Sequence, residues 1–434
     1  MSQFLNEKSR IVFWVLTAWL VLLTSVYSEK ILSKSESKTK PIFPEINVYA
    51  ISNRLTDSHE YSQLNDRLSR FVKRWEVTGA TFCITRNGRL IYARSFGWAD
   101  KEDSLPLEPY HVMRVASVSK LITATAVFKL IESGKLDLGD KVFGKEGILN
   151  QPQFLGYKDK RVEDITILNL LNHSGGWTTR WGDHMFIGDV ISKELGKELP
   201  LSADDYIVFA LSKPLHFQPG SRSSYCNIGY VILQRVIEAI SGMDYESYVK
   251  AEIFEPLNIH DAHISNNWDS LRFENEVRYY EVPEADSIMA FDGSIRKVPR
   301  ARGGNDVHVL GAAGGWVISP LSLTRFALAI DGKKSFPDIL SAKSIESMRN
   351  TFNGQFHPLG WRWVHGDGTL WRSGSMAGTS ALVVCQPDGY TFTFVANHSP
   401  WKGARFPYIV DRYLKRIFPR YIEPLPQKHF FLRK

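Results

Sequence analysis

The stretch MRVASVSKLITATAVFKLIESGKLDLGDKV, residues 113–142, decides the fold that the sequence predicts. From residue 117 to residue 133 its apolar side chains recur on most sides of a helix, and Gly134 follows as a C-cap. A helix that is apolar nearly all round has no face suited to water. We therefore expect residues 117–133 to form a helix inside the molecule.

Strand-like segments lie on both sides of this helix in the sequence. ATFCITRNGRLIYARSFG, residues 80–97, contains two such runs joined by Asn87-Gly88, a dipeptide typical of a tight hairpin. Towards the other end, Pro387-Asp388-Gly389 joins a second pair of strand-like runs. The strand patterns in this later region cover residues 360–372, 379–386 and 389–397.

Helical patterns account for most of the remaining chain. Residues 61–75 and 403–417 carry apolar side chains at helical spacing, and residues 135–300 consist mainly of helical pieces and loops without clear alternating strands. Strands near both chain ends with helices between them suggest one sheet with helices packed on it. We predict an α/β fold of the α+β type: an antiparallel sheet built from both chain ends, flanked by helices, with an inserted, mostly helical lobe at 135–300.

The beginning of the chain has the composition of a targeting segment and a linker. IVFWVLTAWLVLLTSVY, residues 11–27, follows two basic residues, as in an export signal, and is slightly shorter than the roughly 20 residues that span a bilayer. Residues 1–28 are therefore predicted to be a signal peptide or a membrane anchor, which places the protein outside the cytoplasm, periplasmic or secreted. Residues 29–60 are predicted to be a flexible tether, residues 61–420 the main domain, and residues 421–434 a tail.

Composition excludes several classes of function. A chain of 434 residues with 44% hydrophobic residues is globular, and its 53 basic and 46 acidic residues are spread along its length instead of forming one block. This spread argues against nucleic-acid binding; a basic surface suits anionic lipid or a cell-wall polymer, but an ordinary solvated surface is the commoner reading. Cys83, Cys226 and Cys385 show neither CxxC spacing nor nearby histidines. We expect no metal and no cofactor.

Ser117 and Lys120 place a hydroxyl and an amine three residues apart, on one face of the predicted helix. A serine needs a base to become a nucleophile, and a lysine is such a base when burial or a neighbouring cation lowers its pKa. The helix N-terminus would also stabilise negative charge at Ser117. The same spacing begins at Ser35 and at Ser37, but both lie in the predicted tether, where nothing would desolvate the lysine.

A second candidate group is Tyr225-Cys226-Asn227, the only Tyr-x-Asn among 17 tyrosines. A tyrosine between two cations has a lowered pKa and can carry a proton from the nucleophile to a leaving group. The Asn227 amide can hydrogen-bond both a lysine and a substrate. Without the other motifs, the commoner interpretation of Tyr225 is structural: a buried tyrosine whose hydroxyl has a hydrogen-bond partner.

The third candidate group is Arg372-Ser373-Gly374-Ser375, on a predicted strand. Here a cation would face the pocket, and the small residues would let a substrate backbone approach. The backbone amides of Ser117 and Ser375 would then form an oxyanion hole.

These three motifs, in this order and spacing, resemble the serine beta-lactamase and penicillin-binding-protein family, and specifically the class C beta-lactamase-related serine hydrolases. The resemblance spans roughly residues 60 to 417. Each motif is weak by itself, whereas the set is specific. Further segments similar to recurrent segments of the family are residues 79–100, 113–142, 165–177 and 311–327.

The resemblance implies roles for the candidate residues. Ser117 would be the acylated nucleophile, Lys120 and Tyr225 its base pair, Asn227 a contact of substrate and lysine, and residues 372–375 the far wall. The family usually has lysine or histidine where this chain has Arg372, so esterases, D-amino-acid peptidases and carboxypeptidases stay open beside beta-lactamase activity. By the same resemblance His173 is structural.

Two hypotheses about function follow. In the first, the protein is a serine hydrolase that acts through an acyl-enzyme on a small-molecule or peptide substrate: a beta-lactam, a D-amino-acid peptide or a small ester. In the second, it is a non-catalytic binding or scaffold protein of the same fold at the membrane, which residues 11–27 would reach if they are not cleaved. The sequence does not indicate an oligomeric state.

Overall fold

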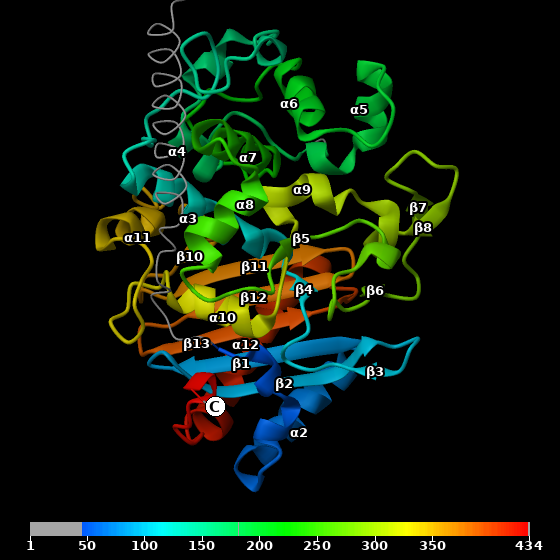
Figure 1. Cartoon of the computed structure of the whole chain (residues 1–434), viewed down its shortest axis with the longest axis vertical. Coiled ribbons are helices and arrows are strands. Elements are labelled where there is room, and N and C mark those ends of the chain that lie inside the picture. The colour runs from blue at the N-terminus through cyan, green and yellow to red at the C-terminus, as the bar shows by residue number, and fades with distance from the viewer. Residues whose placement is uncertain (1–45, 181, 433–434) are drawn as a thin grey trace, which may run out of the picture. The chain divides into compact units, whose positions relative to one another are not determined.

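A computed structural model of the chain describes residues 46–180 and 182–432. Its main feature is a seven-stranded sheet in the order β10-β11-β12-β13-β1-β2-β3, with antiparallel pairing throughout. Strands from the two chain ends lie side by side in Figure 1, because β1 pairs with β13. The predicted α+β fold is thereby confirmed. The strands are β1 (Gly79–Arg86), β2 (Arg89–Asp100), β3 (Leu105–Pro106), β10 (Trp363–Val364), β11 (Leu370–Met376), β12 (Thr379–Cys385) and β13 (Tyr390–Ala396).

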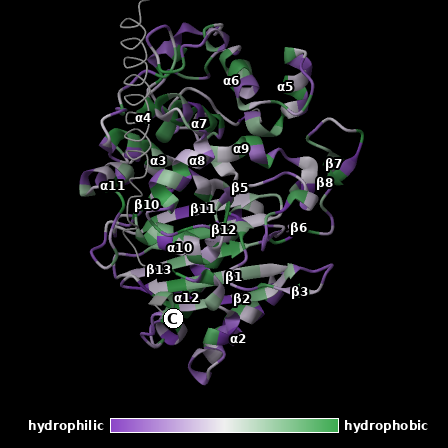
Figure 2. Ribbon diagram, viewed as in Figure 1, coloured by the Kyte–Doolittle hydropathy of each residue, from purple (hydrophilic) through white to green (hydrophobic). Residues whose placement is uncertain are grey.

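Local sequence explains most of these strands. Asn87 and Gly88 both have positive φ, 49° and 74°, as the predicted tight hairpin between β1 and β2 requires. Every residue of β12 and β13 is buried, and Figure 2 shows the apolar character of these central strands. The predicted strand at 360–372 differs: it contains the two-residue β10, a turn, and only the beginning of β11.

Helices cover both faces of the sheet. Successive residues of a strand point to opposite faces, so neighbouring side chains contact different helices. On β11, the Trp371 ring stacks on Tyr408 of α12 (Phe406–Ile417) at 4.4 Å, whereas Arg372 donates a hydrogen bond to the backbone of Ser117 on the other side. Helices α2 (His59–Arg74) and α12 (Phe406–Ile417) pack against each other through the stacked rings of Phe71 and Tyr413. Helix α10 (Pro320–Leu328) contacts β1, β12 and β13.

The predicted interior helix is present, with a different beginning. Helix α3 spans Ser119–Glu132, and Ser117 lies in a preceding 3-10 turn, η3 (Ala116–Val118). Ala116 has a positive φ of 47°, which prevents the α-helix from extending back through it. Residues 119–128 are all buried, and α3 packs against α7 (Ile228–Ser241) and α9 (Val307–Gly314).

The region predicted as a helical lobe, residues 135–300, contains helices followed by short strands. The helices are α4 (Ile167–Leu171), α5 (Gly188–Leu195), α6 (Ala203–Leu211), α7 and α8 (Tyr245–Val249). The strands, absent from the prediction, are β5 (His263–Ile264), β6 (Tyr280–Glu281), β7 (Ser287–Met289) and β8 (Lys297–Pro299). Runs of two or three residues are too short to show alternation in a sequence. The remaining elements are β4 (Met113–Arg114), β9 (Trp316–Ile318), α11 (Ala342–Arg349) and β14 (His398–Ser399).

The ends of the main domain differ from the prediction. The last part of the predicted tether packs on the sheet: Ile51 is buried, and Asn53 Nδ2 donates to the Leu107 carbonyl oxygen at 2.8 Å. The predicted tail is also packed, since Phe430 and Phe431 are buried in the core beside the sheet. Short apolar groups in a polar context give little periodic signal, so composition alone missed both contacts.

The predicted signal or anchor, residues 1–28, and the tether up to residue 45 lie outside the described residues. Within the described part of the chain, no helix combines the length and the apolar composition needed to cross a membrane.

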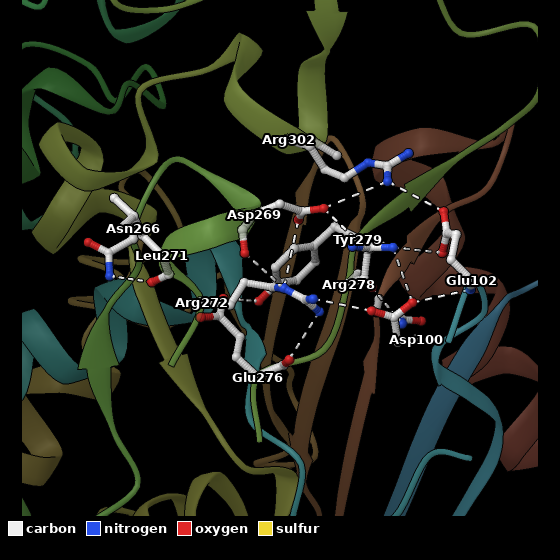
Figure 3. A network of polar contacts seen from close by, with 12 residues as sticks. Asp100, Glu102, Asn266, Asp269, Leu271, Arg272, Glu276, Arg278, Tyr279 and Arg302 are labelled. Atoms are coloured by element: carbon white, nitrogen blue, oxygen red, sulfur yellow. Dashed lines mark hydrogen bonds and ion pairs between the residues drawn. The ribbon is translucent and has the colours of Figure 1, made fainter. Parts of the chain in front are cut away.

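A network of ion pairs joins the end of β2 to the segment before β6 (Figure 3). Asp100, with a side chain only 4% exposed, contacts Arg272 Nη2 at 3.2 Å and Arg278 Nη1 at 3.3 Å. Arg278 Nε also contacts Asp269 at 3.0 Å, and Arg302 reaches Glu102. Three loops far apart in sequence are held together by this network.

Candidate active site

Ser117 lies at the junction of η3 and α3, between residues that are fully buried. Ala116 and Val118 on either side are buried in the core, while Ser117 itself keeps partial exposure. Its hydroxyl has two partners in the structure: Lys120 Nζ lies 3.4 Å from Ser117 Oγ, and the Tyr225 hydroxyl donates to Ser117 Oγ at 2.8 Å. The structure thus brings together the three residues predicted to carry the chemistry.

Lys120 is fully buried one turn along α3. Its ammonium group donates to Asn227 Oδ1 at 2.7 Å and to the Ala313 carbonyl oxygen. Burial lowers the pKa of Lys120, and the nearby charge of Arg372 acts in the same direction, against the opposing effect of Tyr225. Lys120 is therefore held in place by two oxygen acceptors, and its pKa lies below the ordinary value for a lysine.

Tyr225 lies between two cations. Burial raises its pKa, but the charges of Lys120 and Arg372 outweigh burial and lower the pKa to about 8. Arg372 Nη2 donates to the Tyr225 hydroxyl at 3.2 Å, and Lys120 Nζ lies 5.0 Å from the centre of the tyrosine ring. A phenol in this position ionises within reach of physiological pH.

Asn227 connects the lysine to a residue that sequence reasoning missed. Its Nδ2 donates to Asp183 Oδ2 at 2.8 Å, which orients Oδ1 toward Lys120. Asp183 also caps the short helix η6 (His184–Phe186) by accepting from the Met185 amide. In the sequence Asp183 looks like an ordinary helix cap, so no local signal identified its second contact.

Arg372 is 1% exposed and projects from β11 to the nucleophile. Its Nε donates to the Ser117 carbonyl oxygen at 2.8 Å, in addition to the contact with Tyr225. Arg372 therefore supports the backbone at Ser117 and the hydroxyl of Tyr225 at the same time, using two nitrogens of one planar fork.

Gly374 lets β11 pass directly beside the nucleophile. A Cβ atom at this position would lie 2.1 Å from the Val115 carbonyl oxygen and 3.1 Å from the Ser117 amide nitrogen. The half-buried Ser373 and Ser375 flank Gly374, opposite Leu382 and Ser380 of β12.

A cavity of about 790 Å³ begins at Ser375. It extends between η6, α5 and the β7–β8 hairpin, and its lining includes aromatic and charged side chains. These include Phe186, Asp189, Lys193, Tyr206, Phe291 and Arg300. Ser117 does not itself line this cavity; the link is Ser375, which follows Gly374, the residue whose backbone lies against that of Ser117. The cavity is large enough for a small substrate.

Three further residues surround Tyr225. The His173 ring lies 4.4 Å from the Tyr225 ring, and burial lowers the pKa of His173 well below its usual range, so it is neutral. The Arg362 guanidinium lies 4.8 Å from the same ring and contacts His357 Nε2 at 3.0 Å. His357 and Arg362 follow Tyr225 by more than 130 residues in the sequence, and no motif marked them.

Metal chemistry has no visible site in the described ranges. Across residues 46–180 and 182–432, no group of three or more His, Cys, Asp or Glu side chains is arranged to hold a metal ion. Cys83, Cys226 and Cys385 are free and buried.

The chain is similar in sequence and in fold to known proteins. A model of the family described as Beta-lactamase matches residues 64–412. Among curated proteins, Protein flp of Staphylococcus aureus (strain NCTC 8325 / PS 47) is 23% identical over 237 residues, which make up 55% of this chain and 44% of that protein. The chain thus matches less than half the length of this relative.

Two solved structures are similar in fold. A D-amino acid amidase from Ochrobactrum anthropi SV3 has a TM-score of 0.64 at 19% identity, with 83% of this chain and 98% of that chain covered. An octameric penicillin-binding protein homologue from Pyrococcus abyssi has a TM-score of 0.61 at 24% identity, with 82% and 77% covered.

Proposed function

Because the chain belongs to the beta-lactamase family, we propose that it is a serine hydrolase that cleaves amide or ester bonds through an acyl-enzyme. One observation carries the proposal: Ser117 Oγ lies within hydrogen-bonding reach of both the Tyr225 hydroxyl, at 2.8 Å, and Lys120 Nζ, at 3.4 Å. A nucleophile, a base and a cation that tunes the base are the parts that acyl transfer needs.

In the proposed first step, the Tyr225 phenolate accepts the proton of Ser117 Oγ while Oγ attacks the substrate carbonyl carbon. The pKa of about 8 makes this phenolate accessible, and Lys120 and Arg372 stabilise its charge. The carbonyl oxygen becomes an oxyanion, for which the amides of Ser117 and Ser375 are the proposed donors. Tyr225 then returns the proton to the leaving amine or alcohol as the bond to the carbonyl carbon breaks.

Hydrolysis of the acyl-enzyme repeats these transfers with water. Tyr225 accepts a proton from the water that attacks the ester carbon, and Ser117 Oγ leaves with a proton from Tyr225, which releases the carboxylic acid. Lys120 remains hydrogen-bonded to Asn227 throughout, which keeps its nitrogen beside the phenol. Tyr225 and Lys120 act as a coupled pair, so their protons are shared between two groups.

The proposed substrates are a beta-lactam, a D-amino-acid peptide or amide, and a small ester, as for a class C beta-lactamase-related enzyme. Support for a compact acyl group comes from the cavity beside Ser375. We also propose that the enzyme works outside the cytoplasm, on the ground of the apolar run at residues 11–27. Parallel assays with a chromogenic cephalosporin, a short nitrophenyl ester and a D-Ala-D-Ala peptide would rank these substrate classes.

Covalent trapping tests the proposal. Incubation with a fluorescent penicillin and, separately, a fluorophosphonate should add one probe mass to the intact protein, and Ser117→Ala should abolish the adduct. Ser347→Ala is the matched control, because Ser347 is a half-buried serine on helix α11, away from the candidate site, whose hydroxyl donates to the Lys343 carbonyl oxygen at 2.9 Å. Failure of every acylating probe to label folded wild-type protein would favour the non-catalytic scaffold instead.

A further inference from the structure

We propose that a groove between α2 and α12 binds the surface of membranes rich in anionic phospholipids. The groove has a volume of about 400 Å³ and lies on the outer side of the two helices. We call it the arginine groove. Its lining consists of Arg67, Arg70, Phe71, Arg74, Trp75, Ile409, Arg412, Tyr413 and Arg416.

The spacing of the arginines on each helix produces the groove. On α2 they occur at positions 67, 70 and 74, and on α12 at positions 412 and 416, so each set shares one helix face. Apolar side chains on an adjoining face of α2, such as Leu64 and Leu68, are buried in the core. The two helices are pinned together where the Tyr413 hydroxyl donates to the Arg67 carbonyl oxygen at 2.8 Å. The arginines therefore face outward from a rigid helix pair.

The charge of the groove is not balanced by acidic side chains. None of its five arginines takes part in an ion pair within the described ranges, and no acidic residue lines the groove. The contacts they do make are to neutral groups: Arg67 donates to the Tyr421 hydroxyl, and Arg70 to the Asp66 backbone carbonyl. The acidic side chain on α12, Asp411, pairs with Lys415. Five crowded guanidinium groups favour a ligand that carries several negative charges.

Aromatic residues at the rim indicate a bilayer as the source of those charges. The Trp401 side chain is 67% exposed, and its ring lies 6.0 Å from the Trp75 ring at the end of the groove. Lys402 Nζ lies 3.7 Å from the Trp401 ring, and Tyr408 of α12 is also exposed. Tryptophan and tyrosine beside basic residues are typical of the headgroup region of a membrane. A free phosphate or a soluble polyanion would pair with the arginines but would offer no apolar contact to the exposed Trp401 ring.

The groove lies on the sheet face opposite the candidate active site. Trp371 points to α12 and stacks on Tyr408, while its neighbour Arg372 points to Ser117. Docking through α2 and α12 would therefore leave Ser117 and the cavity beside Ser375 away from the lipid. The proposal is independent of the hydrolase assignment, and the Ser117→Ala chain should bind vesicles as the wild type does.

Vesicle partitioning of the full chain tests the proposal. The protein is sedimented with phosphatidylcholine vesicles containing either no phosphatidylglycerol or one third of it. The wild type should partition at least tenfold better onto the anionic vesicles, and salt should reduce the difference. A variant with Arg70, Arg74, Arg412 and Arg416 changed to glutamine should lose most of this preference. The apolar run at residues 11–27 is common to all chains, so differences among them report the groove.

A second variant removes the same formal charge elsewhere. It changes Lys135, Lys145, Lys158 and Lys297 to glutamine, and it should keep the wild-type preference. All four lysines are exposed, and none forms an ion pair with another described residue. Unchanged thermal unfolding and an unchanged far-UV circular dichroism spectrum would show that both variants are folded. The proposal is overturned if the two variants behave alike, or if the wild type does not discriminate between the vesicles.

The last arm separates a bilayer from a soluble polyanion. Trp401→Ala should weaken partitioning onto anionic vesicles several-fold and leave the binding of polyphosphate unchanged. If polyphosphate binds the groove at least as tightly as the vesicles do and Trp401→Ala has no effect on either, the partner is a soluble polyanion and the membrane assignment is wrong.

Discussion

Tyr225 determines how the candidate site responds to protons. Its hydroxyl touches Ser117 Oγ and Arg372, and its ring faces Lys120, so two cations oppose the effect of burial. The base form of such a pair is the deprotonated one. Removal of the proton from Ser117 Oγ therefore depends on the ionisation of Tyr225, which is coupled to that of Lys120.

Activity should rise with pH. Since Tyr225 has a pKa of about 8, lowered from its ordinary value, the base form is lost below pH 8 and kcat/KM for a neutral ester should fall about tenfold per unit there. Tyr225→Phe should lower kcat by a factor of about 10² to 10⁴ and remove this limb. Initial rates between pH 5.5 and 9.5 measure both effects. A wild-type rate that declines from pH 6 to pH 8 would contradict the assignment of the base.

Arg372 should determine the pH below which kcat/KM falls. Arg372→Met removes a cation that favours the phenolate, so the pKa of Tyr225 should rise and the pH profile should shift to higher pH. Arg372→Lys keeps the charge but cannot reproduce both bonds of the planar fork; it should lower kcat/KM while leaving the midpoint near that of the wild type. A purely structural arginine would change stability without moving the midpoint.

Among the elements, β11 comes close to the backbone of η3 and of Val115, the residue before it. Gly374 makes it possible, since no space exists for a Cβ between the strand and the Val115 carbonyl oxygen. The same approach places Ser375 beside the nucleophile, where the proposed oxyanion hole needs its amide. The distance between β11 and η3 therefore has no room to increase without moving the Ser375 amide away from Ser117.

Gly374→Ala should separate these two elements. The added methyl group has no free space, so we expect a loss of kcat/KM of about 10²-fold or more and a destabilisation of about 1–3 kcal/mol. Gly366→Ala is the matched control, because a Cβ there meets no atom within 4 Å. Enzyme assays and urea unfolding of both variants test this expectation, and equal activities in the two variants would refute the close approach.

Over the whole molecule, the ion-pair network of Figure 3 ties the sheet to the loops that lead to the cavity. Asp100 at the end of β2 pairs with Arg272 and Arg278, and Arg302 lies in the turn η9 (Arg300–Gly304), whose Arg300 lines that cavity. Removing one partner of a buried ion pair leaves the other charges uncompensated, so the arrangement of these segments depends on Asp100 being present.

Asp100→Asn should destabilise the fold by about 3 kcal/mol, because it leaves two partly buried arginines without their shared carboxylate. Asp57→Asn, which breaks an ion pair with Arg94 at a carboxylate 58% exposed, should cost less than about 1 kcal/mol. Urea unfolding followed by tryptophan fluorescence measures both. Similar shifts in the two variants would show that the network adds nothing beyond a surface pair.

The sequence by itself determined those features that contiguous residues encode. Apolar periodicity predicted the interior helix of Lys120, Asn87-Gly88 predicted the hairpin, and three short motifs identified the residues that meet at Ser117. Local sterics and burial patterns act over a few residues, so they are readable in one dimension.

Tertiary structure alone decided which distant residues meet. Asp183 beside Asn227, Arg362 over Tyr225 and the packing of Phe430 under the sheet all depend on where whole elements lie. The arginine groove is the clearest case: its charges come from two helices more than 300 residues apart and look evenly spread along the chain. Electrostatic potential and packing sum over neighbours in space, and the order of residues does not reveal those neighbours before the chain folds.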